Sequence, residues 1–191
     1  MKTIIWQNKD GSDYSIEYFN LTSELDVHIL RGTVILLLEQ TPTLAIYEIK
    51  CDKYWKTRSV KISQQTPHGK DMNIDVTVDR DQIWRKHRRE TSYSSIIDFA
   101  SGLYDVDLQI TPATNTLPIR RIDLKDGLSQ ETCVLWIGFP SLALERQVQK
   151  YSRINDKLYS FEIPSTGFKA HLEVDELGLV VNYDTLWHRL Y

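Results

Sequence analysis

The feature that most constrains this chain is a hydrophobic pattern of period two that runs through almost its whole length. Apolar and polar residues alternate in short stretches, most cleanly over 25–29, 74–78, 105–110 and 172–175. Because successive side chains of a strand point to opposite faces of a sheet, the alternation indicates half-buried strands. β-branched and aromatic residues are also frequent in these stretches. We count about fourteen candidate strands and predict an all-β protein.

Turn residues divide these stretches at intervals of roughly 8–12 residues, for example at Thr41 with Pro42. Turns this short favour an antiparallel meander, because parallel neighbours need a crossover of about a dozen residues. So many strands in one open sheet would curl or split into a roll, an incomplete barrel or a sandwich. Within a long strand expected over 25–38, Gly32 is the candidate for a bulge or bend. We expect at most one short helix, near 91–100.

The length of 191 residues fits one domain, 1–191, with no internal repeat or linker. A net charge of −3 gives no global attraction to nucleic acid or anionic lipid. The basic stretch 84–89 is flanked by acidic residues and is interpreted as a solvated hairpin end. We therefore expect no nucleic-acid partner.

The apolar runs are short: the longest, 34–38, is far below the roughly 20 residues that span a bilayer. The N-terminal apolar stretch is also too short for a signal peptide. The two cysteines, Cys51 and Cys133, form no CxxC pair or Cys/His cluster. We expect a cytoplasmic protein with reduced thiols, no stable membrane insertion, no metal and no cofactor.

Catalytic motifs are absent from the sequence: it has no GxSxG, GxxxxGK[ST], GxGxxG or HExxH pattern. The five histidines are scattered singly, and His28 and His171, at outward positions of alternating strands, are interpreted as solvated strand residues. We therefore expect a protein that is not an enzyme.

Several arginines lie at positions that an all-β fold would turn inward. Arg58 and Arg120 lie an even number of positions from neighbouring apolar residues, so on a strand they would point to the same face as those residues. Tyr151 and Arg153 are related in the same way. An unpaired buried charge costs several kcal/mol, so each inward guanidinium needs acceptors. Two interpretations remain open. The arginines form internal ion pairs, or they anchor an anionic or polyhydroxylated head group in a concave sheet.

The segment 111–118, TPATNTLP, is the most unusual stretch of the chain. Its two prolines restrict the backbone, and the side chains of residues such as Thr114 and Asn115 can fix an irregular loop. Such a loop is either architectural or the rim of a binding site. The five tryptophans are core aromatics in the simplest interpretation, although one such as Trp55 could line a cavity for acyl chains or stack on a sugar.

Residues 51–58 (CDKYWKTR), the Asp-Val-Asp-Leu strand at 105–108 and the string 111–121 (TPATNTLPIRR) resemble the bacterial "putative glycolipid-binding" family. Further matches extend the resemblance to about residues 25–190. It implies a single-domain, spirally curved antiparallel β-roll, with a fold likened to the periplasmic carriers of lipoproteins. The family's glycolipid label implies an amphiphilic ligand.

We therefore expect a non-enzymatic protein that holds a glycolipid or other amphiphile in the concave face of a curved sheet. One alternative is a structural or protein-interaction module whose arginines form an internal carboxylate network. Another is a hydrolase that acts on a sugar or lipid. The candidate ligand-binding residues are Trp55, Arg58, Thr114, Asn115, Arg120, Arg121, Tyr151 and Arg153.

Overall fold

The computed structural model describes residues 1–8, 14–67, 69, 71–88 and 93–191. Fifteen strands of these residues form one sheet, in the order β8-β7-β6-β5-β4-β3-β2-β1-β15-β14-β13-β12-β11-β10-β9. The strands are β1 (Lys2–Asn8), β2 (Ser15–Glu24), β3 (Val27–Leu38), β4 (Thr41–Asp52), β5 (Thr57–Gln65), β6 (Met72–Val78), β7 (Trp84–His87), β8 (Ser94–Ile96), β9 (Asp105–Leu108), β10 (Ser129–Gly138), β11 (Ala143–Arg153), β12 (Leu158–Ile163), β13 (Phe168–Val174), β14 (Val180–Tyr183) and β15 (Trp187–Arg189).

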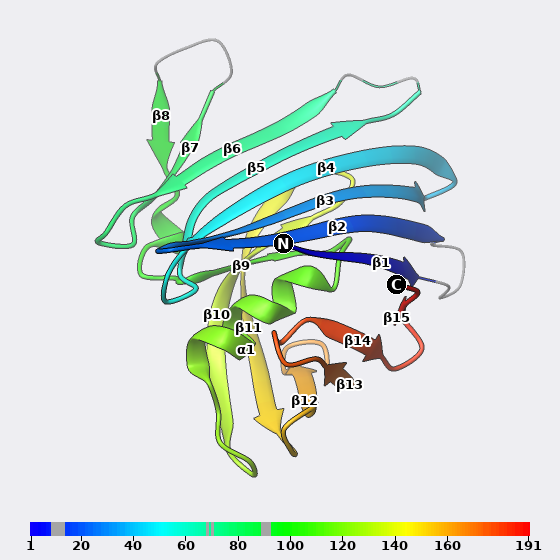
Figure 1. Ribbon diagram of the computed structural model, residues 1–191. Helices are drawn as coiled ribbons and strands as arrows, with labels where there is room; N and C mark the ends of the chain where they lie inside the picture. Colours follow the sequence, from blue (N-terminus) through cyan, green and yellow to red (C-terminus); the bar gives the residue numbers. More distant parts are fainter. Residues whose placement is uncertain (9–13, 68, 70, 89–92) are drawn as a thin grey trace.

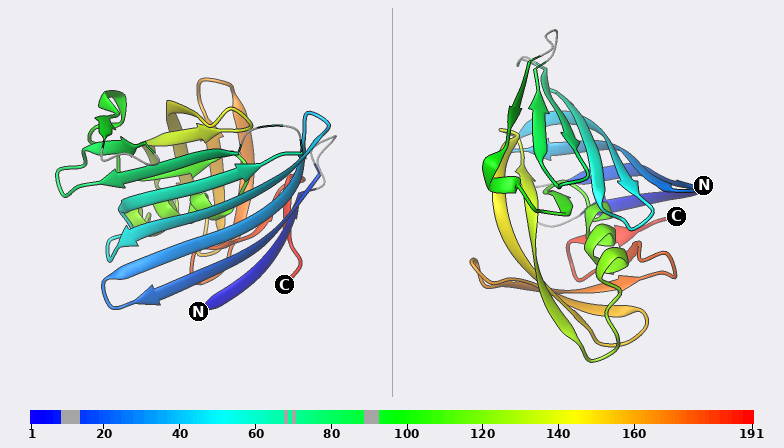
Figure 2. Two further views of the ribbon diagram at one scale, coloured as in Figure 1. Left: turned by 90° about the horizontal axis from the view of Figure 1, so that it is seen from above. Right: turned by 90° about the vertical axis from the view of Figure 1, so that its left-hand side faces the viewer.

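The sheet curls on itself without closing into a barrel, and its two halves enclose the helix α1 (Thr116–Ile122) (Figures 1 and 2). The curl brings the β9 end of the sheet back to β5, where the Thr57 amide donates to the carbonyl of Tyr104 at 2.9 Å. The terminal strands β1 and β15 pair antiparallel near the middle of the strand order. The predicted fold class, an all-β antiparallel roll, is confirmed.

The α-helix lies at 116–122 rather than near 91–100. In the expected region the described residues form β8 and the 3₁₀ turn Asp98–Ala100, whereas residues 91 and 92 lie outside the described part. The alternation over 120–124 suggested a strand, but residues 120–122 continue a short helix whose first part, with Leu117, Pro118 and Ile119, is buried. Proline is tolerated in a first helical turn, and Asp123 ends the helix in the left-handed conformation (φ 49°).

The segment that carries α1 also explains the one parallel pair among the described strands. Strands β9 and β10 pair in parallel, with Val134 beside Asp105 and Ile137 beside Leu108. A parallel pair needs a long crossover, which residues 109–128 provide. The crossover passes through the inside of the roll (Figure 2).

The turns around β3 differ from those expected. Leu25 and Asp26 form the turn between β2 and β3, and Glu39 and Gln40 (φ 46° and 65°) form the next one. Neither turn contains Gly or Pro, so composition gave no signal for them. Gly32 is not at a bulge, because β3 keeps an unbroken register with both of its neighbours.

Each strand of the first half has a buried face and a solvent face. In β2, β3, β4 and β6 the residues at alternate positions are buried, and they form one core with the buried residues of α1 and the second half. Cys51 and Cys133 form no disulfide among the described residues, and Cys51 is buried. The strands therefore present two surfaces on which a site could form: the inner face and the solvent face.

Candidate functional site

The inner face is occupied by the segment 111–121, which we name the motif segment. Every residue from Thr111 to Ile119 is buried, and Thr116 donates its hydroxyl to the carbonyl of Gly178 at 2.9 Å. Figure 2 shows α1 between the two halves of the sheet. The motif segment is thus part of the core and fills the concave side at the positions where we expected a ligand.

Arg121 is held by a buried carboxylate. Its Nε and Nη2 atoms donate to Asp105 at 2.9 and 2.6 Å, and Nη2 also donates to Thr132 at 2.9 Å. The Asp105 side chain is fully buried and that of Arg121 is 13% exposed. The guanidinium group of Arg121 therefore makes a bidentate contact with a carboxylate of the protein itself.

Thr114, Asn115 and Tyr151 belong to a second internal network. Thr114 donates to Asp107 at 2.6 Å, and the Tyr151 hydroxyl donates to the side-chain oxygen of Asn115 at 2.9 Å. Gln149 donates to the other oxygen of Asp107 at 2.7 Å. Burial raises the pKa of Asp107, and the hydrogen bonds from Thr114 and Gln149 oppose that shift. The network holds the motif segment against β9 and β11.

Arg58 and Arg153 also have partners within the chain. Arg58 lies at a bulge between β4 and β5 and donates to Asp52 through Nε (3.1 Å) and Nη2 (2.7 Å). Arg153 donates to the Leu124 carbonyl at 2.7 Å and forms an ion pair with Asp126 at 2.8 Å. Both arginines therefore tie strands to neighbouring turns.

Arg120 is exposed at the end of α1 and not inward, because it lies on a helix rather than on the strand expected there. Its guanidinium lies 5.6 Å from the ring of Trp55. The same ring stacks on His28, with 4.0 Å between the ring centroids. Burial lowers the pKa of His28. Trp55 is 7% exposed within this cluster and lines neither of the two depressions described below.

The predicted site residues therefore do not converge on one cavity. The structure brings Thr114, Asn115 and Tyr151 together, whereas Arg58, Arg121 and Arg153 lie in separate ion pairs. Their role in binding a ligand stays a prediction. A different set of residues, on the solvent face, surrounds an open groove.

The solvent face of β2–β6 is organised in rows that run across the strands, because facing residues are in register. The charged row is Arg31, Glu48, Lys61 and Asp75, each directly opposite the next. The middle row is Tyr18, Thr33, Ile46, Ser63 and Asn73. The apolar row is Ile16, Ile35 and Leu44. The face thus changes from charged to apolar along the strand direction.

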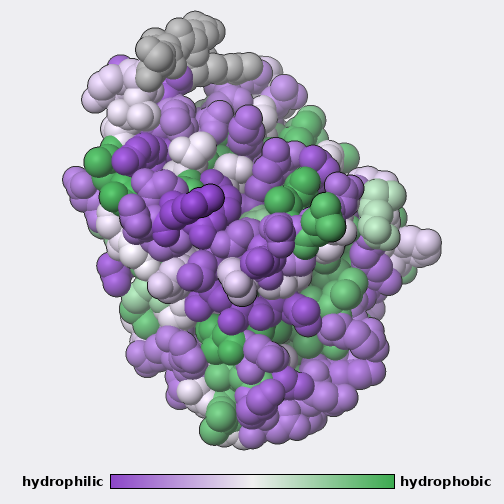
Figure 3. All heavy atoms as spheres, turned by 60° about the vertical axis from the view of Figure 1, so that its left-hand side comes forward, coloured by the Kyte–Doolittle hydropathy of each residue, from purple (hydrophilic) through white to green (hydrophobic). Residues whose placement is uncertain are grey.

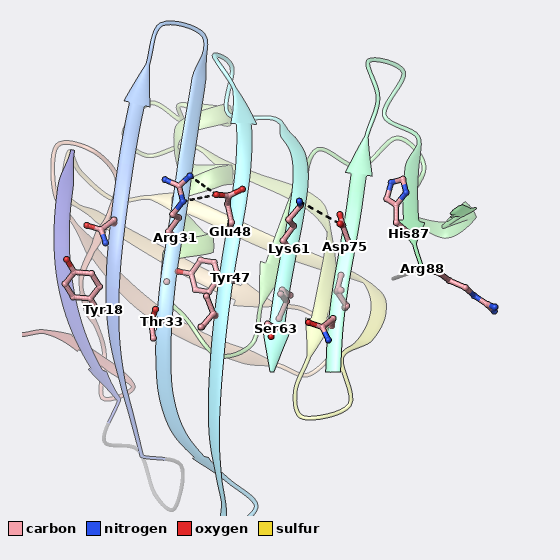
Figure 4. Close-up of a pocket in the computed structure, with 16 residues that line it drawn as sticks. Tyr18, Arg31, Thr33, Tyr47, Glu48, Lys61, Ser63, Asp75, His87 and Arg88 are labelled. Atoms are coloured by element: carbon pink, nitrogen blue, oxygen red, sulfur yellow. Dashed lines mark hydrogen bonds and ion pairs between the residues drawn. The ribbon is translucent and has the colours of Figure 1, made fainter. Parts of the chain in front are cut away.

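The charged and middle rows line a groove of about 550 Å³, which His87 and Arg88 border at the β7 end. Figure 4 shows the charged row at one level across four strands, with Thr33 and Ser63 below it. Tyr18 is 53% exposed, and Ile46 and Ile35 are 47% and 62% exposed. These three side chains leave apolar surface exposed beside a polar groove.

The charges of the row are paired with one another. Arg31 donates to Glu48 through Nε (2.8 Å) and Nη2 (2.7 Å), Lys50 approaches Glu48 at 3.3 Å, and Lys61 lies 3.9 Å from Asp75. Burial alone would raise the pKa of Glu48, but the hydrogen bonds from Arg31 and Lys50 outweigh it and the pKa is lowered. Glu48 is therefore a carboxylate at neutral pH.

At Gly32, the part of β3 that forms the floor of the groove carries no side chain. A Cβ atom at this position would lie 2.1 Å from the Tyr47 ring and 2.5 Å from Glu17. The glycine thus lets the Tyr47 hydroxyl donate to the buried Glu17 carboxyl at 2.5 Å, directly beneath the groove. Burial raises the pKa of Glu17 to about 7. Close packing, rather than a bulge, explains this glycine.

A second depression of about 520 Å³ lies at one rim of the roll, between Thr43, Gln64 and Pro140. Neither large depression is lined by Arg58 or Arg120. Within the described residues no group of His, Cys, Asp and Glu side chains could hold a metal ion. The described helices include none with the length and apolarity needed to cross a membrane.

Sequence reasoning missed the groove because it searched for charges on the apolar face. The available signal was the outward parity of Arg31, Glu48 and Lys61 on successive strands. Turning that parity into a row requires the register of each hairpin, and the turns at 25–26 and 39–40 were not recognised.

Comparisons with known proteins place the chain in a family. Residues 3–189 match the family model described as "Putative glycolipid-binding". A solved structure of a DUF1089 family protein from Pseudomonas aeruginosa is 27% identical, covers 96% of this chain and 95% of that one, and has a TM-score of 0.78. No curated protein matches. From the match over nearly its whole length, the chain belongs to the "Putative glycolipid-binding" family.

Proposed function

We propose that the protein is a non-enzymatic binding protein for an amphiphile of the glycolipid type, and that the ligand binds on the solvent face of β2–β6. The head group lies in the groove of the charged and middle rows, and apolar chains lie along the apolar row. The family description supports the kind of ligand. The observation that carries the location is the change from charged to apolar residues across three adjacent rows.

The filling of the inner face by the protein's own residues supports a ligand site on the solvent face. The motif segment fills the concave side, and the guanidinium of Arg121 is bound to Asp105. A head group there would have to displace a buried ion pair, which costs several kcal/mol. On the solvent face the groove is already open.

A direct test uses n-dodecyl maltoside below its micellar concentration as the probe in isothermal titration calorimetry. We expect saturable binding, and we expect Tyr18→Ala to weaken it roughly tenfold, because the exposed ring contacts the ligand. Tyr54→Ala is the matched control, since Tyr54 is 63% exposed on the turn between β4 and β5. Equal losses in both variants would contradict the proposed location. Lipid mass spectrometry of a solvent extract of the purified protein would identify a co-purifying ligand.

A second candidate is a protein-interaction module. The Arg121–Asp105 and Arg58–Asp52 pairs are the internal network that this alternative requires. It predicts that affinity capture recovers a stoichiometric protein partner and no lipid. The hydrolase alternative needs two free carboxylates at one cavity, whereas Glu48 and Asp75 in the groove are each ion-paired.

A further inference from the structure

The charged row has a regular alternation that bears on the chemistry of the head group. From β3 to β6 the side chains read cation, anion, cation, anion, as Arg31, Glu48, Lys61 and Asp75. With strands about 4.8 Å apart, the row is roughly 14 Å long. It is therefore longer than a single sugar ring and presents donors and acceptors in turn along its length.

The four members of the row carry no net charge together, and the neighbouring cation Lys50 is paired with Glu48. Arg88, at the β7 end of the groove, lies over the ring of Tyr93. Glu48 accepts from Arg31 at 2.7 Å and lies 3.3 Å from Lys50, while Asp75 lies 3.9 Å from Lys61. A phosphate or carboxylate head group would have to compete with Glu48 or Asp75 for these cations and would be repelled by both carboxylates. The row is thus a poor site for an anion, despite its arginine and lysine.

A hydroxyl group fits the same row without that conflict. It donates to a carboxylate and accepts from an ammonium or guanidinium group, so a polyol can bridge successive members while the ion pairs stay formed. The members are accessible for this: the side chains of Arg31 and Lys61 are 50% and 61% exposed, and Glu48 is 24% exposed. In the adjacent row, the exposed Tyr18 ring offers an apolar surface to the C–H face of a sugar (Figure 4).

We propose that the charged row selects a neutral, hydroxyl-rich head group and discriminates against anionic head groups, with Glu48 as the specificity-determining residue. This inference rests on the proposed function, because it assumes that an amphiphile occupies the groove. Beyond the proposed function, it specifies the charge of the head group and the residues that recognise that charge. On the side of the molecule that Figure 3 shows, hydrophobic side chains lie in patches among hydrophilic ones.

The experiment compares two probes that share the same dodecyl alkyl chain, n-dodecyl maltoside and dodecyl phosphate, by titration calorimetry on the wild-type protein. We expect the maltoside to bind at least roughly tenfold more tightly. If neither amphiphile binds, both the inference and the proposed function fail. If both bind equally, or the phosphate binds better, the function stands and the inference is overturned.

The variant Glu48→Gln sharpens this test. It frees Arg31 and Lys50 from their carboxylate, so we expect maltoside affinity to fall roughly tenfold and dodecyl phosphate affinity to rise. Asp75→Asn should act in the same direction through Lys61. Glu173→Gln, at an exposed position of β13, is the control and should leave both affinities unchanged. Parallel losses for both probes in Glu48→Gln would contradict a role in selectivity.

Discussion

The inside of the roll and the solvent face of β2–β6 use charged residues in opposite ways. On the inner side, Asp105 is fully buried and fixed in two-pronged contact with Arg121. On the solvent face, the Arg31 side chain is 50% exposed in its pair with Glu48. A buried pair holds its geometry because breaking it leaves an uncompensated charge, whereas an exposed pair exchanges partners at little cost. The contrast teaches that the distinctive motif segment builds the fold, and that the less conspicuous solvent face is open to a ligand.

The largest expected effect breaks the inner pair. Arg121→Ala should lower the free energy of unfolding by about 3–5 kcal/mol, because Asp105 is left buried without a cation. The matched change on the solvent face, Arg31→Ala, should cost less than about 1 kcal/mol. Urea unfolding of both variants measures the difference. Similar costs for the two variants would mean that the faces do not differ as described.

The next effect uses pH to probe the boundary between the two faces, at Glu17. Because its pKa is raised to about 7 from an ordinary 4.5, the folded state holds a proton that the unfolded state releases. Wild-type stability from this group is therefore complete below pH 4.5 and is lost as pH rises to about 7. Glu17→Gln removes the titration, so its stability relative to wild type should increase over that window by up to about 3 kcal/mol.

Urea unfolding at several pH values from 4 to 8 measures this difference. Glu24→Gln, at an exposed position of the same strand, is the control and should show no such pH dependence. A constant difference between Glu17→Gln and wild type across the window would show that Glu17 is not held in a dry site beside Tyr47.

The sequence predicted the fold class but not the register or the position of the helix. Alternation of period two is visible in individual strands, so the all-β roll followed from it. The helix was missed because the few residues of 120–124 alternate like those of a strand. The conformation of the segment is decided instead by the burial of Leu117 and Ile119 in the roll. A short stretch does not distinguish the two periods.

The candidate site was beyond the sequence for a related reason. Parity placed Arg120 inward only if it lay on a strand, and the helix turns it outward. Arg31 and Glu48 are 17 positions apart in the chain and become neighbours through the register of a hairpin whose turn, Glu39 and Gln40, has no typical turn composition. Both errors arise where tertiary contacts decide the local structure.

The most direct test of the central claim, that the ligand binds on the solvent face and not inside the roll, is chemical-shift mapping of backbone amides during titration with n-dodecyl maltoside. We predict that the shifts concentrate in β2–β6 around Tyr18, Arg31 and Glu48, and that the amides of Thr114 to Arg121 stay unchanged. Shifts centred on the motif segment, with β2–β6 unaffected, would contradict the account.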